Sequence, residues 1–505
     1  MHLTQSLHRR VQADPDGEFT TYQGRVTSNA EMADRAARIA GGLHGLRVKP
    51  GDRVALLDLN TDYFFHASVA IAWADAVIVP VNYRWSVKEM AYSLNEADVE
   101  VLIVGDAFLA MVDELRAASP GITTVIHVGD APTPEGMVTL DELLAAEPVP
   151  DAERGGDSLL GIFYTGGTTG FPKGVMLSHR GVMLSCIGSI AMGRYPRGGR
   201  CLLVAPAFHL AGFANWCMSM LLEQGGIPLP EFTPTGVMQL IEDDEVTSMT
   251  LVPTMIQMVV DHPERDRFDL SGVQLVVYGA SPISDALLDR ARKAFPSARF
   301  CQAYGMTELS PCATILSDED HADPQKRRSA GRPMVYSLCR IAGPDDVELA
   351  RGEVGEIQSK GDHVMLGYWK KPEETEAALR GGWMHTGDGG YMDEDGYVYV
   401  VDRIKDMIIS GGENVYSIEV ENAIAKHPAI VQCAVIGLAD DKWGERVHAI
   451  VQLAPAATLS LEELREFAKK QIAGYKCPQS LEFVDAWPLS GAGKILKREL
   501  RRARA

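Results

Sequence analysis

The chain has 505 residues, a length that suggests about three domains. Hydrophobic residues make up 46% of the chain and charged residues 23%, an ordinary composition for a globular protein. Its formal net charge of −20 argues against nucleic acid or an anionic membrane as the main partner, since both are polyanions. The N-terminus has no apolar stretch of signal-peptide length, which favours a cytoplasmic location.

Two features bear on the cellular environment. The eight cysteines form no CxxC pair and no regular spacing, so the sequence predicts buried thiols rather than disulfides or a zinc site. The stretch 202–222 contains no Asp, Glu, Lys or Arg over a length close to that of a membrane span. Pro206, His209 and Asn215 interrupt it, so we expect a buried strand followed by a buried helix and no stable membrane insertion.

The N-terminal part alternates predicted helices and strands. Ser28 and Glu31 form a capping-box pattern before a helix whose apolar residues recur at helical spacing. Apolar strands that alternate with helices are typical of parallel sheets covered on both faces. The strands are predicted at 54–57, 77–81, 101–104, 202–205, 248–252 and 273–278, with helical segments such as 63–74 between them.

The pattern changes after about residue 337. Short strands with glycine turns, including 353–360 and 397–401, predict a small β-rich subdomain. Beyond Asp402, helices at 418–426 and 461–472 and strands at 433–437 and 448–453 predict an α+β domain. We therefore expect an α/β protein with a large N-terminal domain of stacked α/β sheets plus the β-rich subdomain, over residues 1–401. A small C-terminal domain is expected over residues 402–505.

A run of small and hydroxyl residues, YTGGTTGFPKG at 164–174, is suited to binding phosphates. Its glycines let backbone amides turn inward, its threonines add hydroxyl donors, and Lys173 adds a positive charge. It differs from the P-loop pattern, because Pro172 precedes Lys173 and Gly174 follows it, so the Mg²⁺-binding hydroxyl is misplaced. A flexible surface linker is the alternative interpretation.

Further motifs follow in order: QAYGMTE at 302–308, WMHTGD at 383–388, DRIKDMIISGGEN at 402–414 and GKILK at 493–497. Together with the loop, they resemble the AMP-forming acyl-CoA synthetases, within the adenylate-forming group that includes firefly luciferase and peptide-synthetase adenylation domains. The resemblance covers most of the chain. It implies an enzyme that activates a carboxylic acid with ATP and Mg²⁺ to acyl-AMP, releases pyrophosphate, and forms acyl-CoA with coenzyme A as co-substrate.

Bringing a carboxylate to a phosphate requires charge to be neutralised in the transition state. The resemblance implies that the loop holds the outer phosphates, that Glu308 and Thr165 bind Mg²⁺, and that Lys494 bridges the carboxylate and the α-phosphate. Where the family usually has Ser, this chain has Gly166, so one hydroxyl is missing. The residues expected at ATP or AMP are Thr165, Gly166, Gly167, Thr168, Thr169, Lys173, Gly279, Ala280, Ser281, Gln302, Ala303, Tyr304, Gly305, Met306, Thr307, Asp388, Arg403 and Lys494.

Several of these residues have a plainer interpretation outside the family match. Glu308 is then an exposed residue after a turn, Asp388 a turn residue, Tyr304 a core aromatic and Lys494 a solvent-facing lysine in a tail. Within the match, Asp388 accepts both ribose hydroxyls, as a carboxylate can. The C-terminal domain of the family is mobile and rotates about a hinge, which Asp402 matches. The expected CoA path contains Ser410, Gly411, Gly412 and Trp443.

The acyl pocket is assigned through His209, which matches a family histidine with a catalytic or pocket role. Amino-acid-activating relatives generally carry an aspartate there, so the resemblance implies an acid without an α-amino group, either fatty or aromatic. A lone histidine on an apolar stretch is otherwise a core residue. The expected pocket residues are His209, Phe213, Trp216, Ala280, Ala303 and Gly305.

Other functions stay open. Within the family, the acyl group could pass to a carrier-protein thiol instead of CoA. A P-loop NTPase or kinase is disfavoured by the missing Gly-Lys-Ser/Thr, and a non-catalytic nucleotide-binding protein by the presence of Lys494, Asp388 and Glu308 together. A homodimer is left open as the assembly state.

Overall fold

The computed structural model describes residues 1–165, 172–281, 283–403, 406–411, 413–440, 442–489 and 495–504. It divides into two compact units, residues 1–338 with 359–384, and residues 339–358 with 385–505. The predicted boundary after residue 401 falls inside the second unit and stays a proposal.

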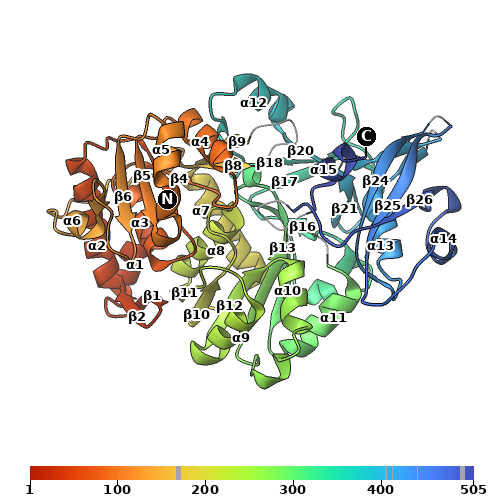
Figure 1. Ribbon diagram of the computed structural model, residues 1–505, viewed down its shortest axis with the longest axis horizontal. Helices are drawn as coiled ribbons and strands as arrows, with labels where there is room; N and C mark the ends of the chain where they lie inside the picture. The colour runs from red at the N-terminus through yellow and green to blue at the C-terminus, as the bar shows by residue number, and fades with distance from the viewer. Residues whose placement is uncertain are drawn as a thin grey trace. The chain divides into compact units, whose positions relative to one another are not determined.

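The first unit contains an eight-stranded sheet in the order β19-β9-β8-β4-β3-β5-β6-β7. The strands from β8 to β7 are parallel, and β9 and β19 add antiparallel pairs at one edge. Figure 1 shows its N-terminal strands in red and orange. The bounds are β3 Arg53–Leu57, β4 Val77–Pro80, β5 Val101–Gly105, β6 Thr124–Val128, β7 Val138–Thr139, β8 Leu159–Thr165, β9 Lys173–Ser178 and β19 Gly367–Tyr368.

A nine-stranded sheet in the same unit has the order β16-β15-β14-β13-β12-β10-β11-β1-β2. Its strands from β14 to β1 are parallel, with antiparallel strands at both edges. The bounds are β1 Glu18–Tyr22, β2 Arg25–Ser28, β10 Arg200–Leu203, β11 Gly225–Pro228, β12 Val246–Leu251, β13 Leu275–Gly279, β14 Arg299–Gly305, β15 Cys312–Leu316 and β16 Arg332–Pro333.

Helices cover both faces of these sheets. Since successive side chains of a strand point to opposite faces, alternate residues of a strand belong to different cores. In β3, Val54 and Leu56 belong to the core shared with the other sheet, whereas Ala55 and Leu57 pack toward α4 and α5. The helices of this unit are α1 Gln5–Ala13, α2 Asn29–Gly45, α3 Asp62–Trp73, α4 Val87–Glu96, α5 Val112–Ala118, α6 Leu140–Leu144, α7 His179–Gly193, α8 Leu210–Leu221, α9 Pro234–Asp243, α10 Pro253–Val260, α11 Asp285–Ala294 and α12 Pro372–Ala378.

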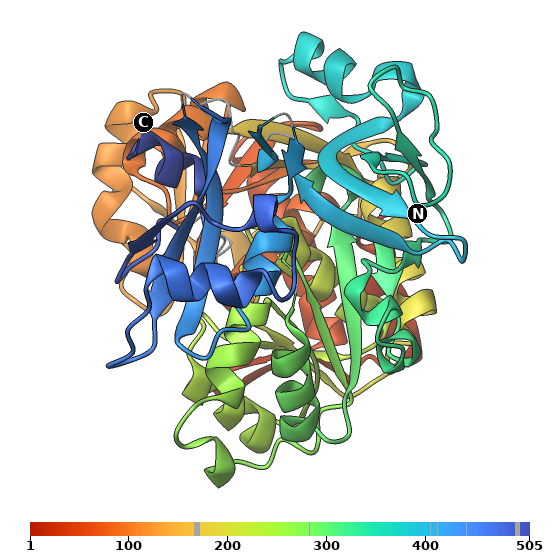
Figure 2. The same ribbon diagram turned by 90° about the vertical axis from the view of Figure 1, so that its right-hand side faces the viewer.

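The second unit contains a five-stranded sheet and most of a four-stranded sheet. The four-stranded sheet has the order β17-β18-β20-β21. In the five-stranded sheet, α13 and α14 pack on one face of β24 and β25, and α15 packs on the other face. Figure 2 shows the blue strands of the five-stranded sheet beside the blue helices. The bounds are β17 Leu338–Ala342, β18 Gly355–Lys360, β20 Met384–Met392, β21 Val398–Arg403, β22 Ile408–Ser410, β23 Glu413–Val415, β24 Ile430–Asp440, β25 Gly444–Leu453, β26 Ser480–Phe483, α13 Ser417–Ile424, α14 Leu461–Ala468 and α15 Lys497–Arg502.

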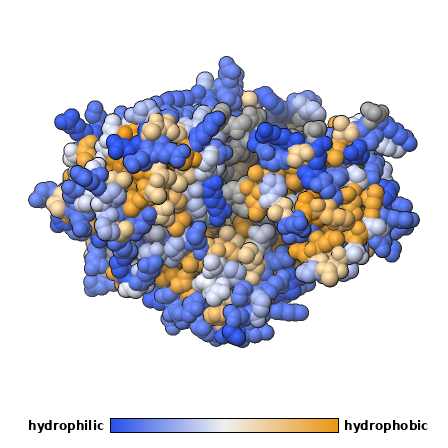
Figure 3. Space-filling model, in the orientation of Figure 1, coloured by the Kyte–Doolittle hydropathy of each residue, from blue (hydrophilic) through white to orange (hydrophobic). Residues whose placement is uncertain are grey.

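The predicted fold class is confirmed, and two local predictions hold in detail. Ser28 and Glu31 make the predicted capping box at the start of α2. The stretch 202–222 forms the end of β10 and the buried helix α8, and among the described residues no helix is both long and apolar enough to cross a membrane. All eight cysteines are free thiols, most of them buried. In Figure 3 the visible surface is largely hydrophilic, with separate apolar patches.

Candidate functional site

The two ends of the predicted phosphate-binding loop meet in the first unit. Strands β8 and β9 are antiparallel, and Thr165 at the end of β8 lies opposite Lys173 at the start of β9. This ladder holds a hydroxyl and an ammonium group at the two ends of the loop. Gly166, Gly167, Thr168 and Thr169 of the loop itself lie outside the described residues.

Glu308 is a buried carboxylate. It lies in the short 3₁₀ turn Thr307–Leu309 that follows β14, with 5% of its surface exposed. The Tyr368 hydroxyl donates to Glu308 Oε1 at 2.8 Å, and the Met365 amide donates to the Glu308 carbonyl oxygen at 2.9 Å. A buried carboxylate oxygen is the type of ligand that a hard divalent cation such as Mg²⁺ selects. The chemistry of this residue therefore fits the predicted metal role.

The residues expected near the base and α-phosphate come from two adjacent parallel strands. Gly279 at the end of β13 is in register with Ala303 in β14. A Cβ at Gly279 would lie 2.3 Å from the Ala303 carbonyl oxygen, and one at Gly305 would lie 2.1 Å from that of Pro311, so chain packing requires both glycines. Ala280 follows with a positive φ of 66°. Ligands bind beyond the carboxyl ends of such strands in open α/β sheets, and these residues lie at that edge.

His209 precedes α8, the helix expected to border the acid. It is half-buried, and its ring centroid lies 4.3 Å from that of Phe208. Phe213 and Trp216 are 0% and 1% exposed, with ring centroids 5.2 Å apart, and both belong to the main core of the unit. Their contact with an acid remains a prediction.

In the second unit, Asp388 and Arg403 lie opposite each other on β20 and β21, with 3.3 Å between Arg403 Nε and Asp388 Oδ1. The sequence predicts a turn at Thr386–Asp388; the structure instead has these residues inside β20, with Gly387 at a φ of 70°. The Asp388 amide donates to the Thr386 hydroxyl, which donates to the Ile357 carbonyl oxygen at 2.6 Å. The local backbone of the motif is thus tied to β18.

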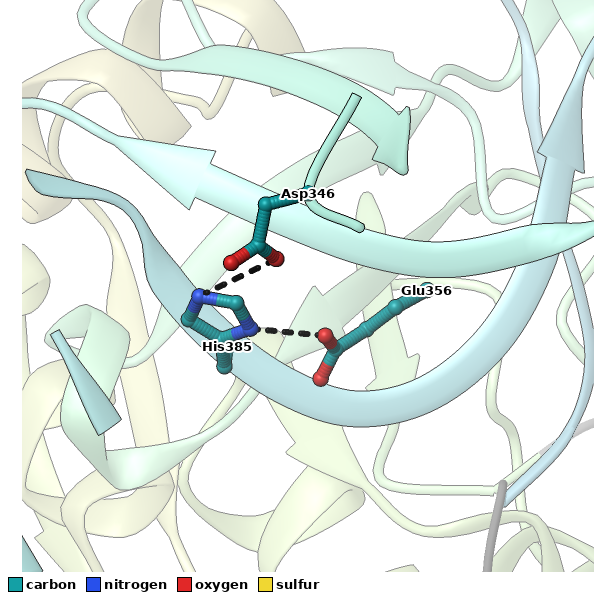
Figure 4. Close-up of side chains that lie close together, drawn as sticks. All are labelled: Asp346, Glu356 and His385. Carbon is teal, nitrogen blue, oxygen red and sulfur yellow. Dashed lines mark hydrogen bonds and ion pairs between the residues drawn. The ribbon is translucent and has the colours of Figure 1, made fainter. Parts of the chain in front are cut away.

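Glu356 on β18 braces the same segment. One carboxylate oxygen accepts from the Gly387 amide at 3.0 Å, and the other lies 2.7 Å from His385 Nδ1. His385 Nε2 lies 3.7 Å from Asp346, so the imidazole lies between two carboxylates, as Figure 4 shows. These contacts fix the segment on both sides of Thr386, directly before Asp388.

The Asp346, Glu356 and His385 cluster has the residue types of a metal site, with ligand atoms within 4.8 Å of one another. The fully buried Gln358 fills part of it: Arg340 donates to Gln358 Oε1 at 2.9 Å, which directs the amide nitrogen to Asp346 at 3.1 Å. An amide donor in this place opposes a cation and favours the carboxylates. We therefore assign the cluster to bracing the β20 segment.

The residues predicted for the CoA path lie together. The Gly411 amide donates to the Trp443 carbonyl oxygen at 2.7 Å, and Ser410 is in register with Gly444. Gly411 has a φ of 63°, and a Cβ there would lie 2.9 Å from the Trp443 ring. Trp443 is 42% exposed. Gly412 lies outside the described residues.

Asp402, the predicted hinge, lies in β21 and is only 2% exposed, and its carboxylate contacts the start of α13. Its carboxylate accepts from the Arg403 amide at 2.7 Å and from the Ser417 amide at 2.5 Å. Lys497 donates to the Ser417 hydroxyl and pairs with Glu421 at 2.7 Å, and burial raises the pKa of Glu421. Lys497 is in the GKILK motif, whose Lys494 lies outside the described residues.

Comparisons with known proteins give the family. A model described as "AMP-binding enzyme" matches residues 7–369, and one described as "AMP-binding enzyme C-terminal domain" matches residues 419–494. The chain belongs to the AMP-binding enzyme family. A feruloyl-CoA synthase from Amycolatopsis sp is 38% identical, covering 98% of this chain and 97% of that protein.

Two further relatives span nearly the whole length of this AMP-binding enzyme. Fatty acid--[acyl-carrier-protein] ligase ScoC from Streptomyces coeruleorubidus is 33% identical, with 99% of this chain and 96% of that protein covered. The structure of o-succinylbenzoate CoA synthetase (MenE) from Bacillus subtilis, in complex with its acyl-adenylate intermediate, has a TM-score of 0.86 and 29% identity, with 98% and 97% covered. The predicted family and enzyme class, an AMP-forming acid–thiol ligase, are confirmed. AMP-binding acyl-CoA ligases use ATP and CoA.

Sequence reasoning missed the partners of the motif residues. Tyr368 contacts Glu308 across 60 positions of sequence, and Glu356 contacts the β20 segment across 31. The only sequence signal at Tyr368 is its position after Gly367, and at Glu356 its position between Gly355 and the apolar Ile357. Neither pattern by itself indicates a contact with Glu308 or with the β20 segment.

Proposed function

We propose that this protein activates an aromatic carboxylic acid with ATP and transfers the acyl group to CoA. The observation that carries the aromatic assignment is the 38% identity to feruloyl-CoA synthase over nearly the whole of both chains. The half-buried His209 beside Phe208, with no carboxylate at that position, suits an acid that has no α-amino group. The family name alone leaves the acid open.

In the first half-reaction, a carboxylate oxygen of the acid attacks the α-phosphorus of ATP and pyrophosphate leaves. Thr165 and Lys173 stabilise the outer phosphates from the two ends of the loop, and Asp388 accepts the ribose hydroxyls. Lys494 neutralises charge where the carboxylate and α-phosphate meet. Glu308 would hold Mg²⁺, which supplies positive charge to the phosphate oxygens when bound. Each of these roles is part of the proposal.

In the second half-reaction, the CoA thiol attacks the acyl carbon and AMP leaves. Ser410, Gly411 and Trp443 are proposed to border the path of the thiol arm, where the missing side chain of Gly411 leaves room beside the Trp443 ring. We further propose that residues 402–505 rotate about Asp402 between the two half-reactions. This rotation would exchange Lys494 for the CoA face at the reacting carboxyl group.

The test is an acid panel assayed with ATP and CoA. Hydroxycinnamic and other aryl acids are compared with straight-chain fatty acids of similar length, and pyrophosphate, ADP and thioester are measured separately. We expect AMP and pyrophosphate, with kcat/KM for the best aryl acid at least about ten-fold above that for any fatty acid, a difference of about 1.4 kcal/mol. A preference for fatty acids contradicts the aromatic assignment. ADP as the main product contradicts the ligase mechanism, and thioester formed on carrier protein but not on CoA contradicts the acceptor.

Asp402→Pro tests the hinge. We expect it to slow thioester formation on the order of ten-fold, while adenylation stays close to wild type, because a fixed φ impedes rotation. The substitution also removes the carboxylate that accepts from the Ser417 amide, at a cost of about 0.5–2 kcal/mol of stability.

Asp402→Ala is the matched control for that loss, since it removes the same carboxylate but leaves φ free. Thermal unfolding of both variants is measured beside the two half-reactions. If alanine slows the thioester step as much as proline does, the hinge assignment fails and the carboxylate itself is responsible.

A further inference from the structure

Tyr368 links two residues that the proposed function assigns to ATP. Its hydroxyl donates to Glu308 Oε1 at 2.8 Å, and Lys173 Nζ lies 4.9 Å from the centroid of its ring. One buried side chain thus contacts the proposed metal ligand through its polar end and the proposed phosphate-binding lysine through its face. Glu308, Lys173 and Tyr368 all belong to the first unit.

The backbone explains why these contacts form. Tyr368 in β19 pairs with Val175 in β9, so Lys173 lies two residues along β9 on the same face of the sheet, in reach of the ring as a diagonal neighbour. The Tyr368 amide donates to the Thr375 hydroxyl at 2.8 Å, and the Trp369 amide to the Gly174 carbonyl oxygen at 2.8 Å. Hydrogen bonds therefore hold the backbone at Tyr368 and at the residue after it, and Tyr368 is 8% exposed.

The hydrogen bond between the two side chains supplies a fixed donor at this place. The Tyr368 hydroxyl donates to Glu308 Oε1, and both residues are buried. A protonated hydroxyl that donates to one carboxylate oxygen sets the direction of the other. Outer contacts of this kind orient metal ligands in many proteins and commonly change metal affinity 10- to 100-fold when they are lost.

We propose that Tyr368 is a positioning residue that orients the Glu308 carboxylate for the divalent cation and the Lys173 ammonium for the phosphates of ATP. This inference rests on the proposed roles of Glu308 and Lys173. The two contacts of Tyr368 are chemically separable, because the hydroxyl acts on Glu308 and the ring face on Lys173. Substitution of a tyrosine with a purely structural role would not affect the binding of metal and of nucleotide separately.

The experiment uses the full chain, Mn²⁺ as the probe for the cation, and an ATP analogue with a methylene group between the α- and β-phosphorus atoms, which cannot release pyrophosphate. Electron paramagnetic resonance measures the Mn²⁺ Kd with the analogue bound, and calorimetry measures the analogue Kd without metal. Tyr368→Phe keeps the ring and loses the hydroxyl, whereas Tyr368→Leu loses both. Tyr399→Phe, which removes a hydroxyl that donates to Asp393 at 3.1 Å in the second unit, is the matched control.

We expect Tyr368→Phe to raise the Mn²⁺ Kd about ten-fold and to leave the metal-free analogue Kd unchanged. Tyr368→Leu is expected to raise both, the metal-free Kd by roughly three-fold as the cation–π contact with Lys173 is lost. Tyr399→Phe should change neither. Thermal unfolding shows whether each variant is folded.

Glu308→Gln separates the inference from the proposed function. If this variant loses Mn²⁺ affinity and Tyr368→Phe does not, the positioning role of Tyr368 is overturned and the metal role of Glu308 stands. If Glu308→Gln also binds Mn²⁺ as the wild type does, both are overturned. Equal changes of the two dissociation constants in the Phe and Leu variants, with a lowered unfolding temperature, would show a structural role and overturn the inference as well.

Discussion

Replacing Lys494 by alanine is expected to slow adenylation by roughly 10²–10³-fold, about 3–4 kcal/mol, the usual cost of losing one charge-stabilising donor in a transition state. The attacking carboxylate and the α-phosphate are both anionic, and in the proposed mechanism Lys494 of the GKILK motif supplies a point charge to both. The second half-reaction, started from synthetic acyl-adenylate and CoA, should be close to wild type, because the proposal has Lys494 act only in the adenylating conformation.

The two steps are measured separately, adenylation by pyrophosphate exchange into ATP and thioester formation by release of AMP. Arg498→Ala on α15 is the control, because it removes a cation four positions away that pairs with the adjacent Glu499. Unchanged adenylation in the Lys494 variant would show that this lysine has no role in that step. Loss of the thioester step alone would assign Lys494 to thioester formation instead of adenylation.

The fold could be predicted well because its strands are buried on both faces. A strand covered by helices on each side must be apolar at nearly every position, and β3, β5 and β13 stand out in the sequence for this reason. Strand lengths were less accurate. The predicted strand at 433–437 is the middle of β24, Ile430–Asp440, whose outer residues are also paired with β25.

The domain boundary is harder to read from sequence. The change to short strands with glycine turns near residue 337 correctly indicates the four-stranded sheet. The residues of that sheet nevertheless come from segments on both sides of the β19 strand. The chain thus leaves one compact unit, enters the other, and returns for residues 359–384. Local composition carries no signal for such a return, since the return depends on pairing between β9 and β19, which lie more than 190 residues apart.

For the site, the sequence predicted residues but not the contacts that hold them. The motifs predicted Glu308, Lys173 and Asp388 as site residues, because the order and spacing of a motif are properties of the chain. Tyr368 and Glu356 became visible only through strand pairing and through hydrogen bonds that join distant segments. The TGD segment shows the same limit: Gly387 and Asp388 are typical turn residues, but hydrogen bonds to β18 keep them in an extended strand with one positive φ.

Glu308→Gln is expected to lower the adenylation rate by roughly 10²–10³-fold. Glutamine has the shape of glutamate and keeps an oxygen that can accept from the Tyr368 hydroxyl, so the change removes one negative charge and little packing. Without that charge the proposed Mg²⁺ is held weakly, and the phosphate oxygens lose positive charge as pyrophosphate leaves. Folding should be little affected, because a buried ionised group is replaced by a neutral one.

The rate of pyrophosphate exchange is measured over a range of Mg²⁺ concentrations, beside thermal unfolding and thioester formation from synthetic acyl-adenylate. We expect the half-saturating Mg²⁺ concentration to rise, the unfolding temperature to stay close to wild type, and the thioester step to be largely retained, because pyrophosphate has left by then. Glu394→Gln, an exposed residue between β20 and β21, is the control for loss of charge alone. A loss of adenylation with unchanged Mg²⁺ dependence would contradict the metal role of Glu308 and leave it a role in orienting the nucleotide. An equal loss of both half-reactions with a lower unfolding temperature would show that the substitution destabilises the fold.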